Sequence, residues 1–508
     1  MNRFTMRLSL PALIATAIAA PALSAQQGGA AALGEFTINA DVGNPTRTGS
    51  ARYEDRTGTY TIEGSGANIW AKKDAFRYVA RPMKGDFILT TRARLLGKGV
   101  DPHRKIGWMI RSALDSSSAH VSGVVHGDGL TSLQFRRSAG AETEQVQSVI
   151  KGADVIQLER RGKTFIMSVA HYGDTLSSVQ TTDIDLGDSV TVGLFVCAHN
   201  DTVMEKATFS DVRITVPARI GFVPYREYIG SNIELMDVAT GQRRIIYRST
   251  GSVQAPNWTR DGKALIYNQD GKLYRYDLAT NTPALINTGF ATRNNNDHVL
   301  SPNGKMLGIS HQPPEPPDNG KSNVYTVPVT GGVPKRVTAV GPSYLHGWSN
   351  DAKFLIYTGI RRDSADIYKI PVSGGTEIRL TTAEGLDDGP EVARDGRIYF
   401  NSTRTGLMQL WRMNLDGSDQ TRLLTSPFND WFPHVSPNGK SIVFISFLTD
   451  VSPTDHPWYK HVYIRQMPVA GGEPKVLAYV YGGQGTINVP SWSPDGRFVA
   501  FVSNTDKY

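Results

Sequence analysis

Cysteine is almost missing from this sequence, because its 508 residues include one, Cys197. A single cysteine excludes an internal disulfide. Cys197 lies in the apolar segment VGLFVCAHN, whose composition is typical of a strand. We therefore expect a buried, unreactive thiol at this position rather than a nucleophile.

Concentrated positive charge is also missing, although the formal net charge is +7 and charged residues make up 20% of the chain. Basic residues occur as pairs, such as Arg136-Arg137 and Arg361-Arg362, and not as longer blocks. Two neighbouring residues of a strand point to opposite faces of its sheet, so each pair divides its charge between two surfaces. This pattern indicates no nucleic-acid partner, since nucleic acids require charge gathered on one surface.

No apolar run after the N-terminus is long enough to span a membrane, so we expect no transmembrane segment. The N-terminus itself reads MNRFTMR, then LSLPALIATAIAAPAL, then small residues around Ala25. This order of basic, apolar and small residues predicts a secretory signal peptide over 1–25. A small-residue linker, QQGGAAALG, follows over 26–34. We expect the mature protein to be periplasmic or secreted.

Several common catalytic motifs are absent: G-x-S-x-G, H-E-x-x-H, the P-loop and the dinucleotide-binding fingerprint. Long helical periodicity is absent as well. The 50 glycines and 28 prolines indicate many tight turns, which favours an all-β fold.

Residues 35–216 alternate apolar and polar side chains in short runs that are separated by Gly, Asp and Asn. The clearest predicted strands cover 76–80, 86–95, 106–110, 132–136, 155–159, 164–169, 190–196 and 207–215. The segments GDFILTTRARL, KIGWMIRSA, LTSLQFRRS and ATFSDVRI resemble the concanavalin/laminin-G-like jelly rolls found beside bacterial glycan-active proteins. The resemblance implies a jelly-roll sandwich that acts as an accessory binding domain.

Residues 219–508 consist of repeats. Turn motifs such as NWTRDGK, LSPNGK and WSPDGR recur with their glycine position at 262, 304, 352 (where alanine stands), 396, 439 and 496. Each motif precedes a short apolar strand, and further strand motifs such as DIYKIPVSGG recur between them. The spacing of 42 to 57 residues matches a four-stranded propeller blade.

The repeat predicts a six-bladed β-propeller that closes on itself. Six turn motifs and six third-strand motifs are present, but they are out of phase. The strands near 230–248 should therefore complete the blade that 490–503 begins. These SPDG-type repeats resemble the TolB-like propeller family, which implies an envelope protein and a Tol–Pal-like scaffold as one function, with a peptidoglycan-associated lipoprotein as partner.

Loops that enter the innermost strand of each blade should meet at one mouth of the propeller channel. His298 and His346 occupy a position where the other repeats have proline, and His434 follows the proline of its own repeat. We predict ligand binding at this mouth by a ring of polar and aromatic residues. Its members are His298, His346, Asp387, Asp388, Glu391, Asp430, Trp431, His434, Gln484 and Asn488, with Asp297 and Asn429 in the same loops.

Histidines beside carboxylates or amides suit a divalent metal such as Mn, Zn or Fe. The set resembles that of oligogalacturonate lyases, which combine a propeller with a metal bound by His and Gln. The resemblance implies metal ligands at His298, His346, His434 and Gln484. A polar channel lining without any metal is the alternative interpretation.

Two further features could contact a ligand. An insertion over 449–460 and its flank add His456, Trp458 and Tyr459, which could stack on a sugar ring, dock a protein or cover a blade edge. Arg404 could contact a ligand or form an ion pair on a blade.

Three functions follow from the sequence. The first is a binding protein for a glycan or an envelope protein. The second is a metal-assisted polysaccharide lyase or glycoside hydrolase. The third is the Tol–Pal-like scaffold.

Overall fold

The computed structural model describes residues 33–223 and 226–507, and every regular element in these ranges is a β-strand. The predicted signal peptide over 1–25 lies outside the described residues, and so does the predicted linker up to residue 32. Within the described ranges there is no helix of the length and apolar character needed to cross a membrane.

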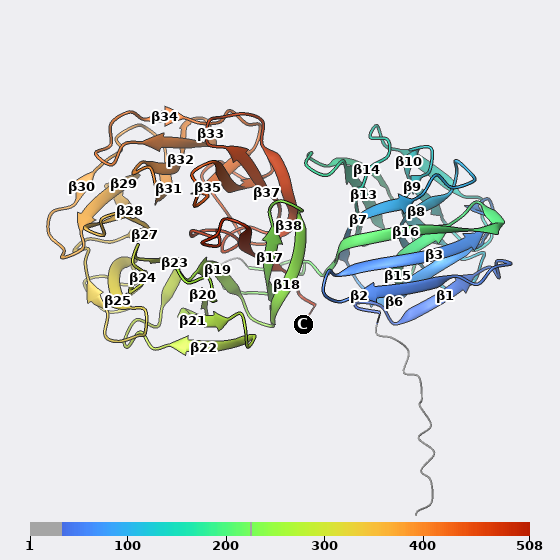
Figure 1. Cartoon of the computed structure of the whole chain (residues 1–508), viewed down its shortest axis with the longest axis horizontal. Helices are drawn as coiled ribbons and strands as arrows, with labels where there is room; N and C mark the ends of the chain where they lie inside the picture. Colours follow the sequence, from blue (N-terminus) through green and yellow to red (C-terminus); the bar gives the residue numbers. More distant parts are fainter. Residues whose placement is uncertain (1–32, 224–225, 508) are drawn as a thin grey trace, which may run out of the picture. The chain divides into compact units, whose positions relative to one another are not determined.

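The described residues up to 215 build two seven-stranded antiparallel sheets (Figure 1). The first sheet has the order β1 (Ile38–Val42), β6 (Phe76–Lys84), β15 (Ser189–Cys197), β8 (Lys105–Arg111), β9 (His120–His126), β10 (Thr131–Arg136), β11 (Glu144–Gln147). The second has the order β14 (Ser177–Thr181), β13 (Thr164–Ala170), β12 (Val155–Arg161), β7 (Phe87–Leu96), β16 (Asn200–Thr215), β3 (Thr59–Gly66), β2 (Ser50–Glu54). A short pair, β4 (Ile69–Trp70) and β5 (Lys73–Asp74), forms a two-stranded sheet of its own.

The two sheets share one apolar core. Trp108 and Leu194 of the first sheet belong to the same buried cluster as Leu89 and Leu158 of the second. Burial of these side chains provides the main driving force that holds the sheets together. Cys197 is also buried, and burial raises the pKa of its thiol to about 11, as expected for an unreactive cysteine.

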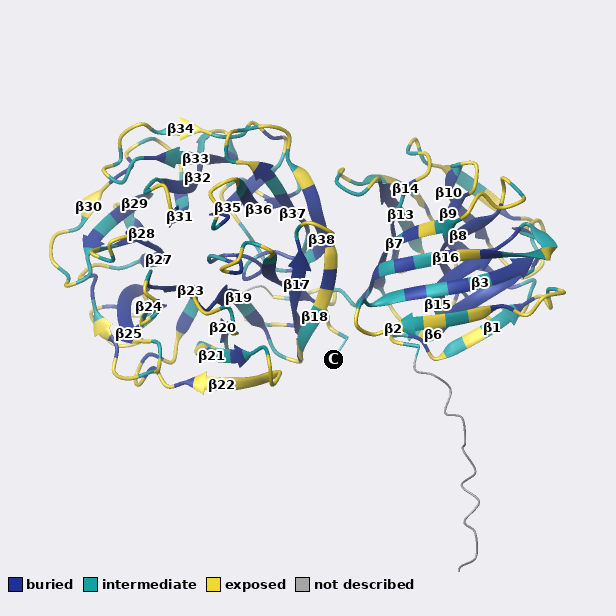
Figure 2. Ribbon diagram, viewed as in Figure 1, coloured by how far each residue is buried: buried dark blue, intermediate teal, exposed yellow. Residues whose placement is uncertain are grey.

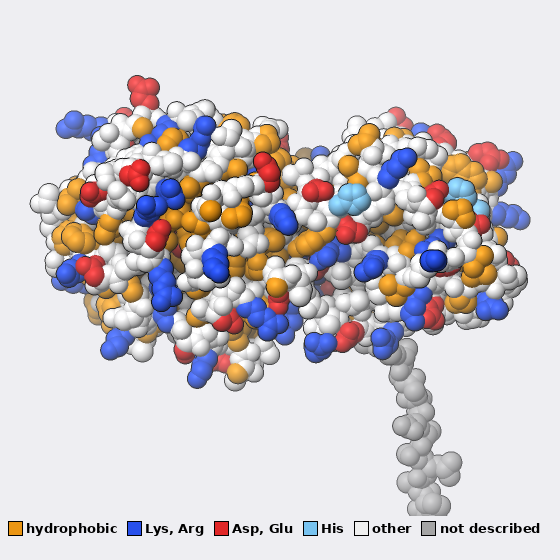
Figure 3. Space-filling model, turned by 45° about the horizontal axis from the view of Figure 1, so that its top comes forward, with side chains coloured by type: hydrophobic (Ala, Val, Ile, Leu, Met, Phe, Trp, Pro, Cys, Tyr) orange, Lys and Arg blue, Asp and Glu red, His pale blue; other side chains and the backbone are white. Residues whose placement is uncertain are grey.

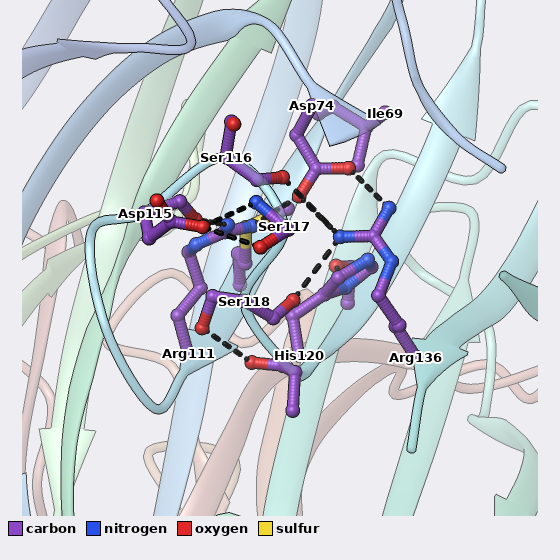
Figure 4. A network of polar contacts seen from close by, with 12 residues as sticks. Ile69, Asp74, Arg111, Asp115, Ser116, Ser117, Ser118, His120 and Arg136 are labelled. Atoms are coloured by element: carbon purple, nitrogen blue, oxygen red, sulfur yellow. Dashed lines mark hydrogen bonds and ion pairs between the residues drawn. The ribbon is translucent and has the colours of Figure 1, made fainter. Parts of the chain in front are cut away.

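A charged network is buried beside this core (Figure 4). Asp74 Oδ2 accepts a hydrogen bond from Arg111 Nη1 at 2.7 Å, and Asp74 Oδ1 accepts one from Arg136 Nη2 at 2.7 Å. Arg136 Nη1 also donates to the carbonyl of Ser118 at 3.1 Å. The side chains of Asp74 and both arginines are fully buried, so their charges are balanced inside the protein and not by water.

From residue 231 the described strands form six sheets arranged in a ring (Figure 1). The closing sheet contains β18 (Gln242–Ser249), β17 (Ser231–Asp237) and β39 (Phe498–Asn504). The next two contain β19 (Val253–Trp258), β20 (Ala264–Gln269), β21 (Lys272–Asp277), β22 (Thr282–Ile286), and β23 (Asn294–Leu300), β24 (Met306–His311), β25 (Asn323–Pro328), β26 (Lys335–Arg336).

The other three sheets repeat this four-stranded plan. They contain β27 (Ser343–Trp348), β28 (Phe354–Arg361), β29 (Ser364–Pro371), β30 (Ile378–Arg379); β31 (Asp387–Val392), β32 (Ile398–Thr405), β33 (Leu407–Met413), β34 (Thr421–Arg422); and β35 (Asn429–Val435), β36 (Ser441–Phe447), β37 (Lys460–Pro468), β38 (Lys475–Gly482).

The predicted closure of the ring is confirmed by strand pairing. β17 pairs antiparallel with β39 over seven residues, with Ile233 opposite Val502. The repeated turns also behave as predicted. Gly262 and Gly496 have φ values of 68° and 70°, and Ala352, which replaces glycine in its repeat, has a φ of 58°. The turn therefore imposes a left-handed residue even where glycine is absent.

Burial changes from the inner to the outer strand of a blade (Figure 2). β35 is buried at every position, whereas β30 and β34 are exposed at every position. On the face shown in Figure 3, acidic and basic side chains are interspersed and not gathered by sign.

Candidate functional site

A cavity of about 760 Å³ is enclosed by the inner strands of the propeller and the loops that enter them. Segments from every blade contribute to its wall. The lining residues are Tyr228, Ser252, Gln254, Asn268, Asp270, Gly271, Thr292, Arg293, Asn294, Asn295, Asn296, Asp297, Gln312, Tyr344, His346, Thr358, Ile360, Ala365, Leu386, Asp388, Phe432, His456, Trp458, Gln484 and Asn488. The volume lies in the range of small-molecule sites.

A β-bulge in each inner strand orients the side chains of this wall. The pairing of β23 with β24 shifts after Asn294, that of β27 with β28 around His346, and that of β31 with β32 after Asp388. A bulge leaves residues without ladder bonds and redirects their side chains. Proline is common at this position in the repeats because it has no N–H to donate.

His346 lies between two carboxylates. Its Nε2 is 3.4 Å from Asp388 Oδ1 and 4.0 Å from Asp297 Oδ1, and all three side chains are largely buried. Burial opposes protonation of His346, but the charge of Asp297 and the hydrogen bond with Asp388 raise its pKa to about 9. The ring is therefore an imidazolium at neutral pH.

The two carboxylates respond in opposite directions. Burial favours the neutral form of Asp388, yet the hydrogen bond and charge of His346 lower the pKa of Asp388 to about 2. Burial raises the pKa of Asp297, and the negative charge of Asp388 adds to this effect. The two carboxyl groups beside the imidazolium therefore have pKa values shifted in opposite directions.

Aromatic rings form another part of the wall. Phe432 stacks on His346 with centroids 5.8 Å apart, and His456 meets Phe432 edge-on at 5.4 Å. Trp458 and Tyr228 lie perpendicular to each other at 5.5 Å. Apolar ring faces next to amides and carboxylates suit a ligand that has both hydroxyl groups and flat apolar faces.

Four of the ten predicted ligand-binding residues line the cavity, namely His346, Asp388, Gln484 and Asn488. The other six, all within the described part of the chain, are not among the lining residues. They are His298, Asp387, Glu391, Asp430, Trp431 and His434.

Alternation along the strands explains most of these differences. Asp387 precedes Asp388 and points the other way, where Arg404 Nη2 donates to both of its carboxylate oxygens at 2.9 Å. Arg404 thus forms an ion pair within its blade, one of the two roles predicted for it from the sequence. His298 follows Asp297, and its Nε2 lies 3.1 Å from the carbonyl oxygen of Ile266.

The remaining members are held inside the blades. Asp430 accepts hydrogen bonds from Ser446 Oγ at 2.6 Å and Arg465 Nη1 at 3.3 Å. Trp431 is fully buried in the apolar core of its blade. These contacts indicate structural roles for both residues.

Two of the histidines predicted as metal ligands have ring nitrogens engaged with protein atoms in this structure. His434 Nδ1 lies 2.5 Å from Glu391 Oε2, and its Nε2 lies 2.6 Å from the carbonyl oxygen of Ile487, so both ring nitrogens are engaged. His298 Nε2 is engaged as well. Among the described residues, the ligand atoms of His, Cys, Asp and Glu come together in one group of three, and it lies elsewhere, at His103, His126 and Asp128. Metal binding at the propeller mouth stays a prediction.

Several lining residues were missed by sequence reasoning. Asn294, Asn295 and Asn296 precede Asp297 in the run NNND, and this run of amides was the available signal. Asn296 is buried, and its Nδ2 has no hydrogen-bond partner in the structure. An amide in this state is ready to donate to a ligand.

The insertion over 449–460 brings side chains to the cavity. His456 and Trp458 line it, whereas Tyr459 is buried and its hydroxyl accepts a hydrogen bond from the amide of Ile229 at 3.1 Å. Two residues of the insertion therefore contribute to the cavity wall, and the third, Tyr459, packs against the segment that contains Ile229.

Comparison with known proteins relates the propeller to one family. A family model described as the TolB beta propeller domain matches residues 346–507. An uncharacterised protein of Agrobacterium fabrum is 46% identical over 274 residues, which cover 54% of this chain and 92% of that protein. A solved structure described as a putative TolB from Agrobacterium tumefaciens is 44% identical, covers 55% of this chain and 99% of that one, and superposes with a TM-score of 0.52. The Tol-Pal system protein TolB of Francisella tularensis is 23% identical over 281 residues, 53% of this chain and 61% of that protein.

Proposed function

Because this chain belongs to the TolB-like β-propeller family, we propose that it is an exported envelope protein that binds a glycan in the cavity of its propeller. The observation that carries the proposal is the composition of the cavity wall. Amides and carboxylates can bond sugar hydroxyls, and Trp458 and Tyr228 can stack on the apolar face of a sugar ring.

Charge in the cavity favours a neutral ligand over a polyanion. Asp270, Asp297 and Asp388 line the wall together with Arg293 and the imidazolium of His346. Two cationic groups thus face three carboxylates, so the wall carries no excess of positive charge. A ligand with many carboxylates would meet acidic residues without enough cations to compensate them.

Calorimetric titration of the full chain with neutral and acidic oligosaccharides tests this proposal. We expect neutral oligosaccharides to bind and oligogalacturonate to bind weakly or not at all. Trp458→Ala should weaken binding by about 1 kcal/mol or more, the typical contribution of an aromatic contact. Trp70, on β4 and 37% exposed, provides the control variant Trp70→Ala. Binding that survives Trp458→Ala and is lost in Trp70→Ala would place the site on the N-terminal sheets instead.

We also propose that the N-terminal region, residues 35–216, is a concanavalin-like jelly roll that serves as an accessory binding domain beside the propeller over 219–508. Its two seven-stranded antiparallel sheets and their common core support this assignment. Export to the periplasm or the medium is proposed from the N-terminal sequence pattern over 1–25.

A carbohydrate-active hydrolase is a second candidate function, favoured by the pair Asp297 and Asp388. One carboxyl group with a raised pKa and one with a lowered pKa can act as acid and base on a glycosidic bond. Release of reducing ends from a bound neutral oligosaccharide, abolished in Asp297→Asn, would support hydrolysis. Binding without any release would leave the protein as a binding protein.

A Tol–Pal-like scaffold is the third candidate, favoured by the likeness to the Francisella protein. A pull-down from envelope extracts tests it, with a peptidoglycan-associated lipoprotein as the expected partner. Failure to enrich any lipoprotein would count against this function.

A further inference from the structure

We propose that the N-terminal sheets carry a transition-metal site of their own, formed by His103, His126 and Asp128. Each of these residues offers a ligand atom, and the three atoms all lie within 4.8 Å of one another. The site is separate from the propeller cavity and from the histidines predicted there. Its donor set, two imidazoles and one carboxylate, suits Zn²⁺ or a similar divalent ion.

Strand order brings the three ligands together. β15, β8 and β9 are neighbours in the first sheet, and Lys105 at the start of β8 lies opposite both Cys197 of β15 and His126 of β9. His103 therefore precedes β8 at the same end of the sheet where His126 completes β9. Asp128 follows in the turn between β9 and β10. All of these positions lie at the same end of three adjacent strands, which we call the edge of the site.

Two turns at this edge are held together by backbone hydrogen bonds. The amide of Gly127 donates to the carbonyl of Arg104, and the amide of Asp128 donates to the carbonyl of Pro102, both at 2.8 Å. A Cβ on Gly127 would lie 2.8 Å from the Arg104 side chain, so a larger residue here would have to displace that side chain. The turns that carry the ligands are thus fixed before any ion arrives.

The side chains at this edge are oriented toward one another. His103 Nδ1 lies 3.7 Å from Asp128 Oδ2, while Asp128 Oδ1 is occupied by the amide of Leu130 at 2.9 Å. The ring centroids of His103 and His126 are 6.0 Å apart and the rings are perpendicular. Ligand atoms of a tetrahedral zinc site lie about 3.3 Å apart, since each bond is about 2.0–2.1 Å. Exposed His103 and Asp128 can close this difference by rotation about their side-chain bonds.

His126 has the features of a metal ligand with an outer partner. The residue is buried, and its Nδ1 has no hydrogen-bond partner. Its Nε2 lies 3.2 Å from the Gln134 carboxamide, whose Oε1 also has no partner. If the Gln134 amide is turned so that Oε1 accepts Nε2–H, in exchange for the hydrogen bonds of Gln134 Nε2 with Ser132 and Gln145, Nδ1 carries the free lone pair.

Neighbouring groups add possible ligands to this cluster. His199 meets His103 edge-on at 5.4 Å, and its Nδ1 is 3.1 Å from Asp101 Oδ2. The nearby cations are engaged elsewhere: Arg104 pairs with Glu205, and Lys105 Nζ donates to Asn68 Oδ1 at 2.9 Å. The carboxylates of Asp101 and Asp128 would offset part of the charge of a divalent cation, against the positive charge of Lys105, which lies opposite His126.

Zn²⁺ titration of the full chain, purified without a histidine tag, tests the proposal. We expect one Zn²⁺ per chain at this site, and His103→Ala or Asp128→Asn should weaken its binding at least about tenfold. Both residues are exposed, so these variants should fold normally. Ca²⁺ should not compete, because it prefers ligand sets made of oxygen atoms.

Two control variants locate the ion. His171→Ala removes an exposed histidine of the same region outside the cluster, and His346→Gln removes the histidine of the propeller cavity. Both should retain the wild-type affinity for Zn²⁺. Unchanged affinity in His103→Ala, absence of Zn²⁺ binding in the wild type, or loss of the ion in His346→Gln would each overturn the assignment.

Discussion

At the scale of single residues, Asp74 shows how a buried charge is stabilised. Burial opposes its ionisation, but hydrogen bonding from Arg136 and the nearby positive charges keep the pKa of Asp74 below its ordinary value (Figure 4). Its carboxylate in turn compensates both Arg111 and Arg136, which are fully buried.

Asp74→Asn should therefore be strongly destabilising. The substitution keeps the shape of the side chain but leaves two buried guanidinium groups without a counter-charge, which costs about 3–5 kcal/mol. Chemical denaturation followed by circular dichroism would measure the loss. Asp55→Asn, at an exposed position, is the matched control and should change stability by less than about 0.5 kcal/mol.

His346 should make stability depend on alkaline pH. Its pKa is about 9 in the folded protein and 6.5 in the unfolded chain, so its contribution is complete below pH 6.5 and is lost as the pH rises through 9. The difference corresponds to roughly 3 kcal/mol. Thermal unfolding between pH 6 and 9.5 should show a decline in the wild type that His346→Gln lacks. A parallel decline in both proteins would contradict this role, and His171→Gln should behave as the wild type.

The sequence predicted the region of the cavity better than the individual residues that line it. His346 and Asp388 were recognisable because polar residues replaced apolar or proline residues in the loops entering the inner strands. His298 and Asp387 are not among the lining residues because each adjoins one, and a step of one position along a strand reverses the side chain. The bulges decide which side chains of an inner strand face the cavity. Their only sequence signal is proline, which the second and third repeats lack.

At the scale of elements, β17 and β39 join the two ends of the propeller. These strands are far apart in the sequence, so their pairing closes a loop that contains most of the domain. Contacts between β17 and β39, the seam of the ring, must offset the entropic cost of closing this loop. Asn232 and Ser503 face each other there, and Asn232 Nδ2 donates to Ser503 Oγ at 3.3 Å.

Replacing both residues with cysteine should lock the ring. Directly opposed strand residues have Cα atoms about 4.5–5.5 Å apart, which suits a disulfide. We expect oxidation of Asn232→Cys/Ser503→Cys to stabilise the propeller by about 2–4 kcal/mol, and reduction to reverse the gain. Cys197 is buried and should not interfere. The single variant Ser503→Cys is the control, and equal melting temperatures with and without reductant in the double variant would refute a stabilising seam.

Apolar strand segments of the N-terminal region were predicted well, whether they alternate or are buried throughout, as the prediction of 106–110 within β8 shows. The predicted strand 155–159 lies within β12, and 190–196 lies within β15. β9, with the sequence HVSGVVH, was missed because Ser122 and Gly123 divide its apolar residues, and glycine is uncommon in strands. The repeats, by contrast, fixed six blades and their closure, since a repeated turn supplies the same information six times.

At the scale of the whole molecule, the chain passes from the N-terminal sheets to the propeller through residues 216–230. β16 ends at Thr215 and β17 begins at Ser231. The described residues between them make few backbone hydrogen bonds, and Ile220 is 94% exposed. Exposed connections of this kind are preferred sites of proteolysis.

Limited trypsin digestion should therefore cut first at Arg219, whose side chain is 62% exposed. Protease access requires local opening of a segment, which costs least where few buried contacts must break. We expect two resistant fragments that mass spectrometry assigns to the two sides of Arg219, before any cleavage within a sheet. The variant Arg219→Gln should delay this cut without changing the rate of later ones. Early cleavage inside a blade or inside the N-terminal sheets would show that 219 is not the weakest point and that the proposed domain boundary is misplaced.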